Sequence, residues 1–186
     1  MTRIFLTLSV LSLVLMLTAM VMGLMIGDLY ADPITDDTLI WARAHRLTGL
    51  AAALSVVLVS SIGVTYFVGT SRWCKEVVET YQLDPRLVAE SAALKRHTFP
   101  WAVSGMLAVV GVVALGGAAD PATLRKGTAA WTDVHLIGSI AGIGFVIWTY
   151  VACWNNIAAN HRLVERIVGE VRQIRQERGL DVDDVS

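Results

Sequence analysis

Residues 47–69 read LTGLAAALSVVLVSSIGVTYFVG, an apolar run that contains no Asp, Glu, Lys or Arg. About 20 residues of α-helix are enough to cross the hydrocarbon core of a bilayer. Three further runs without charged residues lie at residues 4–26, 99–119 and 136–158. The sequence therefore predicts an all-α integral membrane protein, with an antiparallel four-helix bundle over residues 1–160.

The composition agrees with the membrane class and excludes an ordinary soluble domain. Hydrophobic residues make up 55% of the 186 residues, and the mean hydropathy is +0.59. The first run is longer than the ~7–15-residue core of a secretory signal, and no clear small-x-small cleavage site follows it. We therefore expect it to be a retained helix. The lipid bilayer is the expected partner, and nothing indicates nucleic-acid binding. Charge-free spans also argue against an ion-coupled transporter.

The basic residues predict the orientation in the membrane. Eleven of the 15 Lys and Arg residues lie before the first run, between the second and third runs, or after the fourth. The other four lie in the two remaining loops: Arg43, Arg46, Arg125 and Lys126. Cytoplasmic segments carry the excess of Lys and Arg. We expect a bacterial-type inner membrane protein with both termini and the central loop in the cytoplasm.

The cytoplasmic segments carry helix signals of their own. Asp84 and Pro85 are a typical helix start, which predicts a short helix over Arg86–His97 that leads into the third span. Residues 161–186 form the predicted tail, with disorder expected at residues 181–186. Apolar residues recur in the tail at helical spacing: Leu163, Val164, Ile167, Val168, Val171 and Ile174. This pattern indicates a C-terminal amphipathic helix on the membrane surface or against a partner subunit, or else a solvated extension of the fourth span.

A short internal repeat points to the candidate site. Trp41-Ala-Arg-Ala-His45 precedes the second run, and Trp131-Thr-Asp-Val-His135 precedes the fourth. Both segments are Trp-x-x-x-His, and both stand at the entry of a span. The second and fourth spans run in the same direction, so the two histidines are expected at equal depth near the outer face.

Two imidazoles facing each other across a helical bundle suit the axial positions of haem iron. Small residues follow each histidine on its helical face and would leave room for a porphyrin: Thr48, Gly49 and Ala52 after His45, and Gly138, Ser139 and Gly142 after His135. Arg43 and Arg46 could pair with the propionates. The competing interpretation is that Gly138-x-x-x-Gly142 serves helix packing.

The segment Ala44-His45-Arg46-Leu47-Thr48-Gly49 resembles the His-Arg-x-x-Gly element of the haem A synthase family, and Val134-His135-Leu136 resembles its second histidine. That family consists of two four-helix halves, each with a histidine pair from its second and fourth helices. The resemblance implies that this chain corresponds to one half and binds haem through His45 and His135. The family has a glutamate three residues before the first histidine, where this chain has Ala42, which argues against haem A synthesis.

A second pair, His97 and His161, lies near the cytoplasmic ends of the third and fourth spans, among polar neighbours. A second haem or a quinone headgroup at this pair is the weaker interpretation, and a solvated interfacial role is the stronger one. Cys74 and Cys153 fall on or near the cytoplasmic side, where free thiols are expected.

Two functions remain open from the sequence. The first is a membrane b-type cytochrome, or cytochrome subunit, that binds one bis-histidine haem b near the outer face and transfers electrons. The alternative is a non-catalytic structural or assembly subunit of a larger respiratory or photosynthetic complex, held there by its spans and its tail. Whether the chain is an enzyme is left open by the sequence.

Overall fold

The computed structural model describes residues 1–180, so the end predicted to be disordered, 181–186, lies outside the described residues. The described chain consists of helices, turns and loops, which confirms the all-α class. Its elements are α1 (Thr2–Met25), α2 (Asp36–Tyr81), α3 (Arg86–Ala119), the 3-10 turns η1 (Pro121–Thr123) and η2 (Thr128–Trp131), and α4 (Thr132–Glu177).

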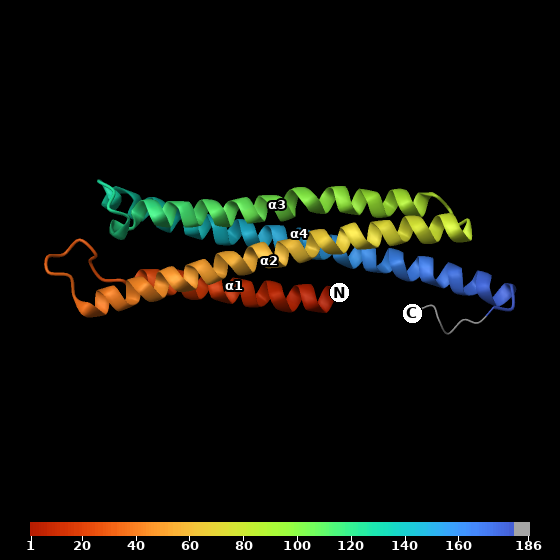
Figure 1. The fold of residues 1–186 in the computed structure, drawn as a ribbon, viewed down its shortest axis with the longest axis horizontal. Helices are drawn as coiled ribbons and strands as arrows, with labels where there is room; N and C mark the ends of the chain where they lie inside the picture. The colour runs from red at the N-terminus through yellow and green to blue at the C-terminus, as the bar shows by residue number, and fades with distance from the viewer. Residues whose placement is uncertain (181–186) are drawn as a thin grey trace.

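The four α-helices lie side by side, and the chain reverses direction at each connection (Figure 1). One end of the molecule holds the connections 26–35 and 120–131, and we call it the histidine end. The other end holds the short turn between α2 and α3 and the end of α4, and we call it the tail end. All four helices are long and apolar enough to cross a membrane, and large apolar side chains such as Leu47, Leu54 and Ile137 face outward.

Local signals explain where the helices begin and end. The hydroxyl of Thr35 accepts a hydrogen bond from the backbone N–H of Thr38 and so caps α2. Asp84 accepts one from the backbone N–H of Arg86 at 2.8 Å, and α3 begins there, as Asp84 and Pro85 predict. The expected short helix from Arg86 is the first part of α3, which continues without a break past Pro100 to its end.

The helices do not stop where the apolar runs stop. With 46 residues and a rise of 1.5 Å per residue, α2 is about 69 Å long, more than twice the hydrocarbon thickness of about 30 Å. The fourth helix has the same number of residues and passes through position 158, where the fourth run ends. Residues 161–177 therefore continue the fourth span as the last part of α4.

The interpretation of the tail as a surface or partner-binding helix is wrong for its apolar stripe. Leu163, Ile167 and Val171 are almost fully buried. They pack in one cluster with Cys74 and Val78 of α2 and with Leu87 of α3. The stripe is covered by the chain itself, because α2 and α3 extend beyond the membrane-spanning region together with α4. The first helix does not reach this region, because its N-terminus lies well short of the tail end (Figure 1).

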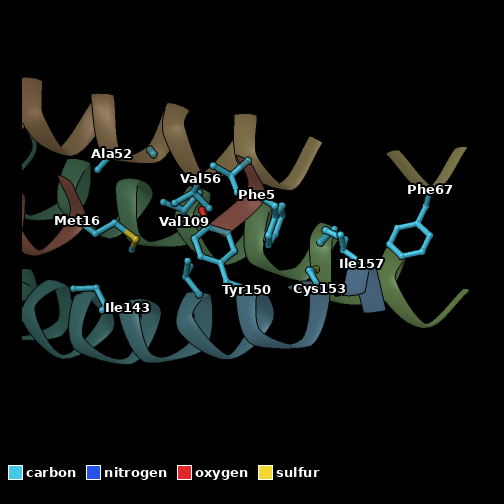
Figure 2. Packing of buried hydrophobic residues seen from close by; sticks show 14 residues of the cluster. Phe5, Met16, Ala52, Val56, Phe67, Val109, Ile143, Tyr150, Cys153 and Ile157 are labelled. Carbon is cyan, nitrogen blue, oxygen red and sulfur yellow. The ribbon is translucent and has the colours of Figure 1, made fainter. Parts of the chain in front are cut away.

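The main core lies between the helices in the middle of the molecule and contains residues from all four of them. Figure 2 shows the ring of Tyr150 beside Phe5, with ring centres 6.0 Å apart in an edge-to-face arrangement. The hydroxyl of Tyr150 also lies 3.0 Å from that of Ser12, and Ser55 donates to Ser12 at 2.9 Å. These hydrogen bonds tie α1, α2 and α4 together within the apolar core.

Candidate functional site

The structure brings His45 and His135 together at the histidine end. His45 lies in the third turn of α2, and His135 lies in the first turn of α4. The centres of the two imidazole rings are 6.0 Å apart, and the ring planes make an angle of 75°. Both side chains are half-buried. The two histidines of the Trp-x-x-x-His repeat, which were expected at equal depth, are thus in direct contact.

The ring of His45 is held by α1, the preceding helix. Its Nδ1 lies 2.8 Å from the backbone carbonyl oxygen of Ala19. A carbonyl oxygen can only accept, so Nδ1 carries the proton, and the neutral ring then has its lone pair on Nε2. The ring also lies against Gly23, where an added Cβ would be 3.0 Å from Cε1 of the imidazole. This arrangement fixes the ring and leaves Nε2 as its free nitrogen.

The ring of His135 has equivalent surroundings in the second hairpin. It lies against Gly116 of α3, where an added Cβ would be 3.0 Å from Cε1 of the imidazole. Val112 stands one turn before this glycine, as Ala19 stands one turn before Gly23, and its backbone carbonyl lies near the imidazole. Nδ1 of His135 is buried and has no hydrogen-bond partner within residues 1–180. The internal repeat thus extends from the histidines to the helices that support them.

Gly23 and Gly116 were missed by the sequence reasoning, which looked for small residues only after each histidine. The signal in the sequence is a glycine near the end of the helix that precedes each Trp-x-x-x-His segment. It becomes recognisable only when the helix pairing is known, because many glycines are present and most face no ring.

The small residues predicted to line a porphyrin cleft have different environments. Cβ atoms added at Gly138 and Gly142 would lie 2.5 Å from side-chain carbons of Leu115 and Val112. These two glycines therefore pack against α3, as the helix-packing interpretation holds. Gly49 faces open space, with no atom within 4 Å of an added Cβ, and Ala52 is buried in the main core.

The two arginines near His45 lie at the surface of the histidine end. Arg46 Nη1 forms an ion pair with Asp120 Oδ2 at 3.0 Å, and its Nε donates to the carbonyl of Ala42. Asp120 follows α3, so this pair connects the first hairpin to the second. Arg43 is exposed. Both guanidinium groups are on the same helical segment as His45.

The second predicted pair is not brought together. His97 and His161 are both exposed, and Nε2 of His161 lies 3.4 Å from a carboxylate oxygen of Glu165, one turn further along α4. Asn160 is a fully buried polar residue toward the tail end. Its amide nitrogen donates to the hydroxyl oxygens of Tyr66 at 3.1 Å and Thr70 at 3.0 Å. This network holds α2 against α4.

Within residues 1–180 no group of three or more His, Cys, Asp or Glu side chains is arranged to hold a metal ion. The two cysteines are buried free thiols in the structure. Comparison of the chain with models of protein families, with curated proteins and with solved structures finds no match. The paired rings of His45 and His135 are therefore the feature from which a function can be inferred.

Proposed function

We propose that this chain is a membrane b-type cytochrome, or a cytochrome subunit, in which His45 and His135 bind one haem from opposite sides. The observation that carries the proposal is the 6.0 Å separation of the two ring centres. A metal–imidazole bond is about 2 Å long. Two imidazoles on opposite sides of one metal ion therefore have ring centres about 6 Å apart. Rings that share one axis can be rotated about it, so the 75° angle is compatible with this arrangement.

The set of donors favours haem over a bare metal ion. Structural zinc takes four protein ligands and catalytic zinc commonly three, whereas this site supplies two imidazoles. A metal that brings its other ligands with it needs only two, as haem iron does. A six-coordinate haem supplies one-electron transfer when it is bound.

The chain's own residues would hold the ligating nitrogens of His45 and His135 in place. The carbonyl of Ala19 fixes the tautomer of His45 so that Nε2 is free, which is the usual role of an outer hydrogen-bond partner of a ligating histidine. The buried Nδ1 of His135, which has no hydrogen-bond partner in the described chain, would gain the Val112 carbonyl as its acceptor after a small rotation of the ring. The glycines at 23 and 116 allow both rings to lie directly against the preceding helices.

Orientation is part of the same proposal. The histidine end faces the outside of a bacterial-type inner membrane, and both termini face the cytoplasm. This is supported by the excess of eleven basic residues over four on the tail-end side. Electron exchange would then take place near the outer surface, at the depth of His45 and His135. The proposal includes a larger complex only in one sense: the chain is either a cytochrome on its own or the cytochrome subunit of such a complex.

The test is the visible spectrum of the purified protein, with the haem type identified as its pyridine haemochrome. We expect a low-spin haem b, which becomes high-spin or is lost in His45→Ala and in His135→Ala. The matched controls, His97→Ala and His161→Ala, should leave the spectrum unchanged, because those side chains are exposed and apart. A normal low-spin spectrum in the His45→Ala, His135→Ala double variant refutes the assignment. A colourless wild-type protein from haem-replete cells would favour the structural-subunit alternative.

A further inference from the structure

A groove lies at the histidine end, between the end of α3 and the connection to α4. Its volume is about 460 Å³, and six residues line it: Ala114, Leu115, Ala118, Arg125, Lys126 and Trp131. The α3 residues give it a wall of small and apolar side chains, and the connection gives it two cations and an indole. None of these residues contacts the histidine rings by a hydrogen bond or ion pair in the described chain.

The two cations of the groove have no acidic partner within residues 1–180. Arg125 and Lys126 are exposed, and neither makes an ion pair or side-chain hydrogen bond within residues 1–180. The acidic residue at the end of α3, Asp120, is already paired with Arg46 and caps η1 through the N–H of Ala122. The groove therefore carries two adjacent positive charges that a negatively charged ligand could meet.

The apolar residues beside these cations are also uncovered. Leu124 is 93% exposed, although burying a leucine side chain is favourable by about 1.5–3 kcal/mol. Trp131 is 45% exposed, and indole rings in membrane proteins concentrate at the level of the lipid headgroups. Exposed apolar side chains next to unpaired cations match the two parts of an amphipathic anion.

We propose that this groove binds an anionic phospholipid. The phosphate meets Arg125 and Lys126, one acyl chain lies along Ala114, Leu115 and Ala118, and Leu124 enters the adjoining lipid. Charge complementarity selects a lipid with a net negative headgroup over a zwitterionic one, since a neutralising ammonium group would compete with the two side chains. The proposal is independent of the haem assignment, because it involves neither histidine.

The test uses the purified full chain in detergent and phospholipids with brominated acyl chains, which quench nearby tryptophan fluorescence. We expect brominated phosphatidylglycerol to quench at lower concentration than brominated phosphatidylcholine. The preference should fall by about fivefold for each cation removed in Arg125→Gln and in the Arg125→Gln, Lys126→Gln double variant. Replacing Trp131 by Phe should remove most of the quenching that phosphatidylglycerol adds.

The matched control is the Lys95→Gln, Arg96→Gln double variant, which removes the same charge at the tail end of α3. It should keep the full preference. Equal quenching of the wild-type protein by the two lipids would overturn the proposal and leave a soluble acidic partner as the groove's occupant. A preference that survives in the Arg125→Gln, Lys126→Gln variant would overturn it as well. Size-exclusion profiles of the variants verify that each is folded.

Discussion

Replacing Gly116 by Ala tests whether the helix before each histidine determines the position of its ring. The new Cβ would lie 3.0 Å from Cε1, 3.4 Å from Nε2 and 3.5 Å from Nδ1 of His135. Carbon atoms in contact are usually about 3.5–4.0 Å apart. The ring must therefore retreat from Gly116 by roughly half an ångström or more.

The neighbouring residue provides a matched control. An added Cβ at Gly117 meets no atom within 4 Å, so Gly117→Ala changes the helix without touching the ring. In a helix interior, Ala is favoured over Gly by about 0.5–1 kcal/mol, and both variants gain this term. Overpacking of a well-packed site costs about 1–3 kcal/mol, and only Gly116→Ala incurs it. We expect Gly116→Ala to be less stable than Gly117→Ala by about 1–3 kcal/mol.

The assay is equilibrium unfolding of both variants in mixed detergent micelles, followed by circular dichroism, with the haem spectrum of the folded variants as a second readout. The displaced ring should also weaken or alter the low-spin spectrum in Gly116→Ala, while Gly117→Ala keeps that of the wild type. Equal stabilities and identical spectra for the two variants would refute the reasoning, because the contact of Gly116 with the ring would then have no energetic consequence.

Three further changes test the rest of the molecule. Ile167→Ala should cost about 2–5 kcal/mol of unfolding free energy because Ile167 is fully buried, whereas Ile174→Ala, at a partly exposed position, should cost clearly less. Similar losses of unfolding free energy in the two variants would contradict the packing of α4 at the tail end. Asn160→Ala removes the two hydrogen bonds that Asn160 donates to α2 and should cost about 1 kcal/mol at about 0.6 kcal/mol each, measured by the same unfolding assay; no change would mean that the network is not stabilising. A cysteine introduced at the exposed Ala122 should react with a membrane-impermeant maleimide from the periplasmic side of intact cells, whereas the buried Cys74 should react only after denaturation. Labelling of the new cysteine only from the cytoplasmic side would reverse the proposed orientation.

The apolar runs were a good guide to the number of helices and a poor guide to where they end. In lipid, a single segment can satisfy its backbone N–H and C=O groups only by forming a helix. A run of residues without charge therefore indicates a helix within the bilayer. Residues 70–81 and 159–177 carry charges and lie beyond the runs, yet they are helical. They are stabilised by packing against each other, through Cys74, Leu163 and Ile167 among others. Helical spacing indicates that one face is buried but does not say which surface covers it.

The candidate site was predictable in its two histidines and not in their supports. The Trp-x-x-x-His repeat placed His45 and His135 at the same depth because the two spans that they begin run in the same direction. Gly23 and Gly116 contact the rings through the register of each hairpin, which depends on the length and course of the connections 26–35 and 120–131. Gly138 and Gly142 were expected to line a cleft because they follow His135 on its helical face. The register of the hairpin instead places them against α3.

The supports of the two rings show how the site depends on the whole bundle. His45 is positioned by α1 and His135 by α3, so each hairpin holds one ring on its own. The contact between the rings, however, exists only where the hairpins meet, and there the Arg46–Asp120 ion pair also joins them. A ligand bound by both histidines would bind the assembled pair of hairpins and not the separated ones. By linkage, such a ligand stabilises the association of the hairpins in proportion to the logarithm of its concentration over its Kd. Nδ1 of His135, which is buried and has no hydrogen-bond partner within residues 1–180, is consistent with a ring whose final orientation would be set by such a ligand.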